Sequence, residues 1–296
     1  MCGIMGWYSF GHTLPDKDKI TTMFSLLESR GRDASGYAFI DGDDLVVHKA
    51  PIKSSDMIKT DDWKKLTLPK VMILHCRMKT QGSEQNNANN HPLYSKQGIA
   101  IVHNGIIYND KEIFGKKQRD GEVDSESILH LLSMKIRGDK IKRLFDRIEG
   151  SFAVAVIDRN DPEKLILVKK DNPIDLYFNS EDDILYFCSE REIMKQALKI
   201  QSISSRGFNL GEGNYHSYEM QNNHCLIINA DGVENYQKYY SRDRWFERKF
   251  HYPDYEDEVI IECPWCYCKT SYREGKLFNK CEVCGMGINE EDLYVI

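Results

Sequence analysis

The chain begins with MCGIMGWYSF (residues 1–10), in which a cysteine directly follows the initiator methionine and a glycine follows the cysteine. This run predicts a first β-strand. Cys2 then has two interpretations: a small buried side chain on that strand or, once Met1 is removed, the first residue of the working protein. In the second case its α-amine, with a pKa of about 7.7–8.0, could take the thiol proton. Nucleophile and base would then share one residue.

The bulk composition restricts the classes of protein that the chain can form. It has 296 residues, of which 41% are apolar, a net charge of −6 and a pI of about 5.9. This length suits either one large domain or one domain plus a small module. The acidic balance does not favour nucleic acid or an anionic membrane as a partner. No apolar run of about 18 residues and no signal peptide is present, so we expect a cytoplasmic protein without a membrane span.

Strand-like runs alternate with a few helical stretches over residues 1 to about 240, which predicts a layered sandwich of sheets and helices. Apolar spacing predicts a helix over 16–29, with Gly31 as a left-handed cap. Ser189 and Glu192 are spaced as a capping box ahead of a short helix.

Further helices are predicted from near Asp124 and over about 140–148. The composition changes after residue 240, where charged and aromatic residues replace the strand-like runs. We therefore expect one domain over 2–240, a linker over 241–258 and a cysteine-rich module over 259–296.

Five of the nine cysteines lie in the last 34 residues. CPWC (263–266) and CEVC (281–284) are two Cys-x-x-Cys knuckles with 14 residues between them. Two such knuckles predict a tetrahedral structural Zn²⁺ site, and no organic cofactor is expected. The predicted ligands are Cys263, Cys266, Cys281 and Cys284. Cys268 is an extra thiol, either a bystander or a competitor of Cys266.

The charge of the C-terminal segment bears on its role. Residues 241–296 contain eight Lys and Arg against twelve Asp and Glu, a net charge of −4. This field repels phosphate, so a structural or partner-docking role is favoured over nucleic-acid binding. A catalytic zinc is disfavoured because four thiolates leave no open position on the metal.

Five short motifs follow one another behind Cys2. They are RGRDASG (30–36), HCRMKTQG (75–82), NNHP (89–92), HNGIIYN (103–109) and DSES (124–127). Together with MCGI they resemble the class II glutamine amidotransferases, N-terminal-nucleophile hydrolases that take ammonia from glutamine. The resemblance extends through about residue 240. It implies an α+β fold, a four-layer αββα sandwich of the N-terminal-nucleophile hydrolase type, here followed by a small zinc ribbon.

The resemblance also implies roles for individual residues. Cys2 matches the nucleophile that attacks the glutamine side-chain amide and forms a γ-glutamyl thioester. Asn104 and Gly105 match the oxyanion hole, through a side-chain amide and a backbone N–H. Arg77 matches the residue that holds the substrate α-carboxylate. Asp124 matches the carboxylate that holds the α-ammonium, so that the two charges together select a free amino acid.

The loop after the arginine departs from the family pattern. Where the family often has an aromatic residue followed by Ala-Thr-His-Gly, this chain has MKTQG at 78–82. Thr80 and Gly82 keep two substrate-binding positions, whereas Lys79 and Gln81 change the others. His91 lies where the family has a histidine near the site, and a structural role for it is as well supported as a chemical one.

Each of these residues also has an ordinary structural explanation. The Asn-Gly pair at 104–105 is a hairpin-turn signal. Asp124 could cap the helix that follows it, and Arg77 could lie on the surface of a strand. Arg30 and Asp33 are expected to pair and brace a supporting loop. The amidotransferase interpretation accounts for the motifs together, whereas the structural ones account for each singly.

We therefore predict a glutamine-hydrolysing enzyme that makes glutamate and ammonia. No synthase signature is recognisable beside the domain, so an ammonia-accepting synthase or transferase is expected in trans, docking on the ribbon or on 241–258. Two alternatives stay open. One is an amidohydrolase that acts on another γ-glutamyl compound, and the other is a non-catalytic scaffold held by zinc.

Overall fold

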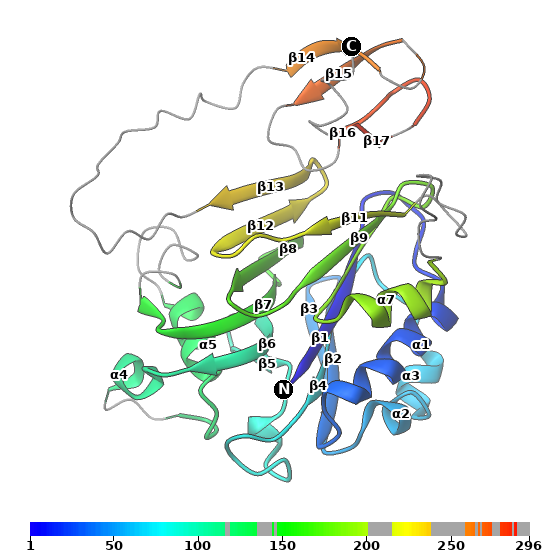
Figure 1. Cartoon of the computed structure of the whole chain (residues 1–296). Helices are drawn as coiled ribbons and strands as arrows, with labels where there is room; N and C mark the ends of the chain where they lie inside the picture. The colour runs from blue at the N-terminus through cyan, green and yellow to red at the C-terminus, as the bar shows by residue number, and fades with distance from the viewer. Residues whose placement is uncertain are drawn as a thin grey trace, which may run out of the picture.

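The computed structural model describes residues 1–115, 119–134, 144, 147–200, 215–237, 258–263, 266, 268–273, 279–285 and 287–288. Within these residues, two large antiparallel sheets pack face to face and carry helices on their outer faces (Figure 1). The helix expected over 140–148 and the linker expected over 241–258 lie almost entirely outside the described residues.

The first sheet has seven strands in the order β11-β9-β10-β1-β4-β2-β3. Their bounds are β1 (Gly3–Ser9), β2 (Ala34–Asp41), β3 (Asp44–Ala50), β4 (Val71–Arg77), β9 (Asp175–Asn179), β10 (Ile184–Cys188) and β11 (Tyr215–Glu219). The N-terminal strand β1 is thus central and pairs with β4 on one side and β10 on the other. All seven of its residues are buried, as expected for a strand covered on both faces.

The second sheet has six strands in the order β13-β12-β8-β7-β6-β5. Their bounds are β5 (Leu93–Tyr94), β6 (Ile99–Ile107), β7 (Gly150–Asp158), β8 (Asp161–Lys170), β12 (His224–Asn229) and β13 (Gly232–Gln237). Strand β6 pairs with β7 over its whole length, which fixes the position of its last residues. Strands β12 and β13 form a hairpin at one edge of this sheet.

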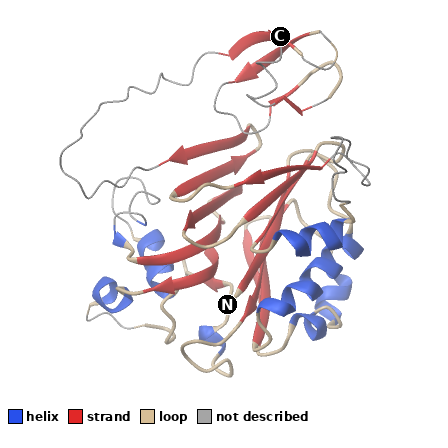
Figure 2. Cartoon of the chain, viewed as in Figure 1, coloured by secondary structure: helices blue, strands red, loops and turns tan. Residues whose placement is uncertain are grey.

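Helices make the two outer layers (Figure 2). Their bounds are α1 (Lys17–Leu27), α2 (Ser54–Met57), α3 (Asp61–Lys65), α4 (Asp110–Phe114), α5 (Glu126–Ser133) and α7 (Arg191–Leu198), with 3₁₀ turns η1 (Glu28–Arg30) and η2 (Asn87–Asn89). Helices α1, α2, α3 and α7 pack on the first sheet, and α4 and α5 on the second. The four-layer αββα prediction is confirmed. Among the described helices, none is long and apolar enough to cross a membrane.

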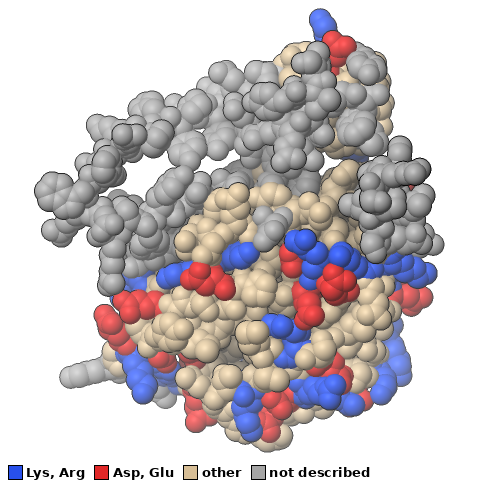
Figure 3. Space-filling view, viewed as in Figure 1, with Lys and Arg blue, Asp and Glu red and all other residues tan. Residues whose placement is uncertain are grey.

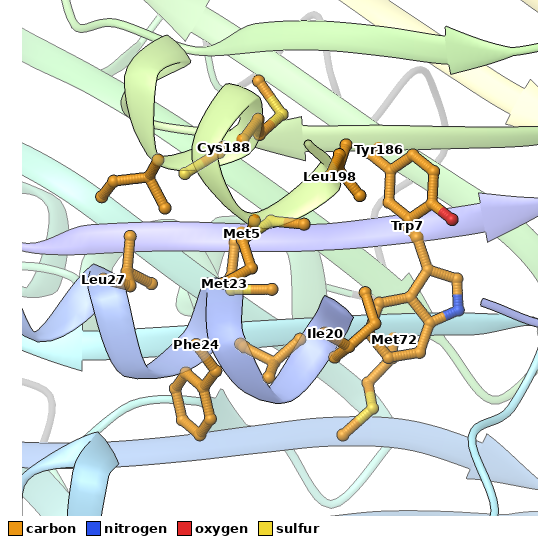
Figure 4. Close-up of a cluster of buried hydrophobic side chains, with 14 of the residues drawn as sticks. Met5, Trp7, Ile20, Met23, Phe24, Leu27, Met72, Tyr186, Cys188 and Leu198 are labelled. Carbon is orange, nitrogen blue, oxygen red and sulfur yellow. The ribbon is translucent and has the colours of Figure 1, made fainter. Parts of the chain in front are cut away.

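Helix α1 shows how the outer layer forms. The Asp16 side chain caps its first turn by accepting from the N–H groups of Asp18 and Lys19, at 2.7 and 3.2 Å. Spacing of three and four residues then puts one apolar stripe on the sheet. Figure 4 shows this stripe against β1, with Met5 and Trp7 facing it; its members are Ile20, Met23, Phe24 and Leu27.

Two local predictions about helix ends are wrong. Gly31 has an extended backbone with φ −175°, because the 3₁₀ turn η1 continues α1 before it. A Cβ on Gly31 would lie 2.3 Å from the carbonyl carbon of Arg77, so the glycine permits close backbone approach. The N-cap of α7 is Glu190 without a side-chain bond. The Ser189 hydroxyl instead accepts the N–H of Ile4, at 3.2 Å.

The interior is divided into three apolar layers. One lies between the first sheet and its helices, and another between the second sheet and α5. The middle layer joins the two sheets through residues such as Ile4 of β1 and Val102 of β6. This packing holds the starts and ends of β1, β4 and β6 in fixed relation.

The cysteine-rich module has four short strands: β14 (Glu258–Glu262), β15 (Lys269–Arg273), β16 (Asn279–Lys280) and β17 (Gly287–Ile288). Glu258, which we assigned to the linker, therefore begins β14. The module contacts the first sheet at the turn between β9 and β10. There, Lys280 Nζ lies 2.9 and 3.0 Å from the two carboxylate oxygens of Asp183.

The described surface carries charges of both signs. Figure 3 shows Lys and Arg interspersed with Asp and Glu on the visible face. Several form close pairs, such as Lys59 with Asp56 at 3.0 Å and Lys195 with Glu192 at 2.7 Å. Mixed charge of this kind gives the face no strong field of one sign.

Candidate active site

Cys2 lies where the ends of two central strands meet. Gly3 of β1 pairs with Cys76 of β4. Cys2 therefore lies beside Arg77, at the same end of these two strands. The Cys2 thiol lies 3.6 Å from the carbonyl oxygen of Met78. The amino group of Met1 donates to the Met78 sulfur at 2.9 Å. With Met1 in place, the α-nitrogen of Cys2 is a peptide nitrogen and not a base.

The surroundings of Cys2 set its ionisation. Part of the side chain is accessible, yet burial of the thiol raises its pKa above the ordinary value. The hydrogen bond from Met78, the N-terminal charge and Arg77 oppose this by lowering the pKa, whereas Asp124 raises it. The thiol is therefore protonated at neutral pH, so attack on a substrate requires a base. The thiol also lies within electrostatic reach of the Arg77 guanidinium and the Asp124 carboxylate.

Asn104 and Gly105 lie near the end of β6. Asn104 is fully buried, and neither its Nδ2 nor its Oδ1 has a hydrogen-bond partner among the described residues. A buried amide with both ends unsatisfied is costly and is rare unless a ligand completes it. Gly105 has φ +152°, and a Cβ there would lie 2.1 Å from the carbonyl oxygen of Ser151. Only glycine fits this position.

Asp124 precedes helix α5 and contacts the end of β6. Its Oδ2 accepts from the N–H of Ile107 at 2.6 Å, and its Oδ1 lies 3.4 Å from the hydroxyl of Ser125. It is not the N-cap of α5: that residue is Ser125, and it makes no side-chain cap bond. The carboxylate is thus anchored to β6 at Ile107, three residues along the strand from Asn104.

Arg77 is not a surface residue, as its structural explanation would require, because only 3% of it is exposed. Its Nη1 donates to Asn90 Oδ1 at 2.7 Å, and its Nη2 donates to the carbonyls of Gln81 and Gly82. A guanidinium has five N–H donors, so these three bonds leave two for another acceptor. The loop after β4 is thereby folded back onto Arg77.

Three histidines form a buried group between the sheets and this loop. His75 stacks on His91 with ring centroids 4.3 Å apart, and His91 lies 6.4 Å from His103. Burial lowers the pKa of all three, that of His75 to about 3, so they are neutral at physiological pH. His103 Nδ1 meets the hydroxyl of Ser125 at 2.7 Å. Both His91 nitrogens lack a partner among the described residues.

The remaining predicted positions fall in the loop after β4. Thr80 is exposed there, and Gly82 has φ +66°, which favours glycine. Lys79 donates its N–H to Asp33 at 2.6 Å, and its ammonium pairs with Glu84 at 2.9 Å.

The expected pairing of Arg30 with Asp33 is wrong. Arg30 Nη1 lies 3.6 Å from Glu190 Oε2, and Asp33 accepts from the backbone of Lys79 instead. Both contacts join segments far apart in the sequence. Arg30 thereby ties the 3₁₀ turn after α1 to the start of α7.

The described structure also contains a cavity of about 630 Å³ away from Cys2. It lies between strand β5 and helices α4 and α5, with Tyr94, Phe114 and Glu126 in its walls. Cys2, Asn104 and Arg77 do not line it. The candidate site is therefore defined by the convergence of strand ends and not by this cavity.

The four predicted metal ligands are brought together in the ribbon. The sulfurs of Cys263, Cys266, Cys281 and Cys284 all lie within 4.8 Å of one another. Cys263 and Cys284 are 3.8 Å apart, and Cys266 and Cys281 are 3.6 Å apart. Tetrahedral Zn–S bonds of about 2.3 Å place sulfurs about 3.8 Å apart, so this cluster could hold a metal. Cys268 is exposed and outside the cluster.

Comparison with known proteins agrees with this geometry. Residues 75–196 match a family described as a glutamine amidotransferase domain. The chain is 34% identical over 183 residues to glutamine–fructose-6-phosphate aminotransferase (isomerizing) of Aquifex aeolicus, and 35% over 184 residues to that of Thermotoga maritima. These matches cover 59% of this chain, which spans only about 30% of the length of these relatives.

A solved structure shows the same fold. It is a glutamine phosphoribosylpyrophosphate amidotransferase from B. subtilis, complexed with ADP and GMP, with a TM-score of 0.61 and 21% identity over 80% of this chain and 49% of that one. The αββα layers of this chain are therefore the fold of a solved amidotransferase, and Cys2 lies directly before the central strand β1. Over residues 75–196 the sequence also matches a glutamine amidotransferase domain.

Sequence reasoning missed two residues beside the site, Asn89 and Asn90. Both are fully buried, and Asn90 holds Arg77 directly. The signal available was the asparagine-rich run NNANN at 86–90, which is unusually polar for a segment that the fold buries at its end.

Proposed function

We propose that this chain hydrolyses L-glutamine to glutamate and ammonia through a γ-glutamyl thioester on Cys2. The observation that carries the proposal is the buried amide of Asn104, beside Gly105, which has no hydrogen-bond partner in the described part of the chain. An amide donor kept free of protein partners in a buried position is suited to a charge that develops only during reaction. The similarity to glutamine–fructose-6-phosphate aminotransferases supports the choice of glutamine as substrate.

The proposed reaction begins once Met1 has been removed. The freed α-amine of Cys2 takes the thiol proton, and the thiolate sulfur bonds to the side-chain carbonyl carbon of glutamine. The oxygen becomes an oxyanion that accepts from Asn104 Nδ2 and the Gly105 N–H. The C–N bond then breaks, and the ammonium form of the α-amine returns its proton to the leaving ammonia. Water attacks the thioester, releases glutamate and restores the thiol.

Charge complementarity accounts for the proposed substrate selectivity. Arg77 supplies a guanidinium for the α-carboxylate, and Asp124 supplies a carboxylate for the α-ammonium. Thr80, Gly82 and His91 belong to the surrounding substrate-binding shell in this proposal. The assignment of these residues is supported by the loop that folds onto Arg77, where the Gly82 carbonyl oxygen accepts from Arg77 Nη2 at 2.9 Å.

We further propose the division into an amidotransferase domain over 2–240, a linker over 241–258 and a zinc ribbon over 259–296. The sulfur spacing of the four-cysteine cluster supports Zn²⁺. Four thiolates would fill the coordination sphere, so the metal would stabilise the ribbon and take no part in glutamine hydrolysis.

The acceptor of the ammonia is proposed to be a synthase or transferase that binds in trans. Ammonia released into water at neutral pH becomes ammonium, which is not a nucleophile, so a useful product needs an acceptor nearby. We expect the isolated chain to turn over glutamine slowly and to accelerate when its acceptor binds. Full turnover by the isolated chain, unchanged by any added synthase, would contradict the trans arrangement.

The proposal is tested with 6-diazo-5-oxo-L-norleucine, a reactive glutamine analogue. The chain is expressed without an N-terminal tag, incubated with the analogue and measured by intact-protein mass spectrometry beside Cys2→Ala. We expect loss of Met1 and one covalent adduct that the variant does not form. A processed Cys2 that stays unlabelled would instead favour another γ-glutamyl substrate, and a retained Met1 would favour a scaffold.

Asn104→Ala tests the oxyanion contact separately. The loss of one such donor is expected to lower kcat for glutamine by about 10²–10³-fold. Alkylation of Cys2 by iodoacetamide, which makes no oxyanion, should proceed at the wild-type rate. Equal losses in both reactions would show that the substitution disturbs Cys2 itself.

A further inference from the structure

Asn89 lies between the two loops that carry the proposed charge pair. It ends the 3₁₀ turn η2 and is fully buried. One of the loops, residues 78–84, follows β4 and folds onto Arg77. The other, residues 119–123, leads directly into Asp124. The side chain of Asn89 is an amide, which donates two hydrogen bonds and accepts others in one plane.

The Asn89 amide bonds to both loops at once. Its Nδ2 donates to the carbonyl oxygen of Ser83 at 2.9 Å and to Glu122 Oε2 at 3.0 Å. Its Oδ1 accepts from the N–H of Glu122 at 2.7 Å. Both donors are therefore used, one on each loop, and the acceptor is used on the second loop.

A glycine in each loop allows the backbone to approach the Asn89 amide closely. A Cβ on Gly82 would lie 2.5 Å from Asn89 Nδ2, and a Cβ on Gly121 would lie 2.6 Å from Asn89 Oδ1. No real Cβ approaches so closely, so each loop presents backbone to the amide. The distance between the loops is thus set by the width of one asparagine side chain.

The neighbouring residue extends the same bridge to Arg77. Asn90 Oδ1 accepts from Arg77 Nη1 at 2.7 Å, and Asn90 Nδ2 donates to the carbonyl of Glu84 at 2.7 Å. Glu122, held by Asn89, lies two residues before Asp124. The dipeptide 89–90 therefore connects the guanidinium, through the first loop, to the carboxylate at the end of the second.

We propose that Asn89 is a positioning residue that fixes the separation of Arg77 and Asp124, and through it the affinity for a free α-amino acid. This inference rests on the proposed glutamine hydrolysis. Asn89 makes no contact with the thiol, so its effect falls on substrate binding and not on the reactivity of Cys2. Aspartate cannot replace it, because a carboxylate lacks both donors and would face Glu122.

The test compares three variants of the full chain. Asn89→Ala removes the bridge. Glu122→Ala removes a single bond through an exposed side chain, so it keeps the fold even if Asn89→Ala does not. Gln85→Ala is the matched control, an exposed side chain directly after the loop 78–84. Each is assayed for glutamine hydrolysis, for labelling by the diazo-oxo-norleucine analogue and for alkylation by iodoacetamide, which has neither α-group.

We expect Asn89→Ala to raise KM for glutamine by at least about tenfold, as for the loss of buried hydrogen bonds, with kcat within about threefold of wild type. Labelling by the glutamine analogue slows in proportion, and alkylation by iodoacetamide is unchanged. Glu122→Ala shows a smaller rise in KM, and Gln85→Ala shows none. A KM like that of the control, or a loss confined to kcat, would overturn the inference.

Hydrogen exchange separates this inference from the proposed function. In Asn89→Ala, amides of both loops, 78–84 and 119–123, are expected to exchange faster than in wild type. Faster exchange in the first loop alone would refute the bridge. If both loops respond but the wild-type chain takes no label from the glutamine analogue, the proposed function fails. The role of Asn89 in amino-acid binding is then overturned as well, although the bridge itself stands.

Discussion

Between the sheets and helices of the amidotransferase domain, the buried apolar side chains form three large clusters, whereas the described ribbon has one small cluster. The ribbon cluster consists of Cys263, Tyr272, Cys281 and Ile288. Two of its four members are cysteines of the metal-ligand set. The domain is thus held by area removed from water, whereas the ribbon has a cluster of four cysteines that could hold a metal.

This contrast places function and stability in separate parts of the molecule. The domain positions Cys2, Arg77 and Asp124 through strand ends that the apolar layers fix. The ribbon contributes no described side chain to that group. Changes in one region should therefore leave the other largely unaffected, and the following predictions test this independence.

The largest effect is expected on removal of the ribbon's metal. Cys281→Ser should abolish zinc binding, which contributes about 10–16 kcal/mol in comparable structural sites, and unfold the ribbon. Metal content and hydrogen exchange in β14–β17 measure this. Cys268→Ser is the matched control, because Cys268 lies outside the cluster and should keep one zinc per chain. A shift in the melting of the αββα domain would contradict the independence of the two regions.

The reciprocal change is a cavity in the domain. Phe24 is fully buried between α1 and the first sheet, with its ring 5.3 Å from that of Trp63. Phe24→Ala should lower the free energy of unfolding by about 3–5 kcal/mol, measured by urea denaturation. Leu14→Ala, at a side chain that is 40% exposed, should change it little. Zinc content should stay the same in both, and its loss in Phe24→Ala would show that the ribbon depends on the domain.

A pH effect is expected from the buried histidines of the domain. The buried histidines have folded-state pKa values below the unfolded value of about 6.5, so the unfolded chain binds more protons than the folded one below that pH. Stability therefore falls as the pH drops from about 6.5 toward 3, with a slope of up to about 1.4 kcal/mol per pH unit for each histidine. His91→Leu should reduce this slope in urea denaturation between pH 6 and 4. An unchanged slope would mean that His91 does not titrate on unfolding.

The smallest effect is expected where the two regions touch. The Lys280–Asp183 pair joins side chains that are 41% and 35% exposed, and such a pair contributes less than about 1 kcal/mol. Lys280→Glu should shift domain stability within that range, and combining it with Asp183→Lys should restore it. A double-mutant cycle on urea unfolding gives the coupling. A larger coupling would show that the ribbon is an integral part of the fold.

Periodic sequence patterns predicted the elements better than the contacts between them. The apolar spacing over residues 17–27 was sufficient to predict helix α1, and the ordered motifs were sufficient to predict the layered fold. The spacing works because it reflects burial on one regular face of the helix. Gly31, Ser189 and Arg30 were misread because their partners lie far along the chain. Ser189 bonds to Ile4, and Arg30 pairs with Glu190. Because these partners are distant in the sequence, the local spacing of residues cannot predict either contact.

The candidate site shows the same division. Arg77, Asn104 and Asp124 were predicted from motifs, but the bridge of Asn89 to Glu122 was not. Asn89 and Glu122 lie 33 positions apart, one in a short 3₁₀ turn and the other in an irregular loop, where neither α-helical nor strand periodicity applies. Only the fold places the two loops on either side of one amide.

The central position of β1 also determines when the site can form during synthesis. Met5 pairs with Cys188, so one neighbour of the first strand is made about 180 residues later. At about 5–20 residues per second, the ribosome needs about 10–40 s to produce it. During that interval one edge of β1 stays unpaired. The end of β1 next to Cys2 then has only β4 beside it. The first side chain after the initiator is therefore among the last to gain its full surroundings.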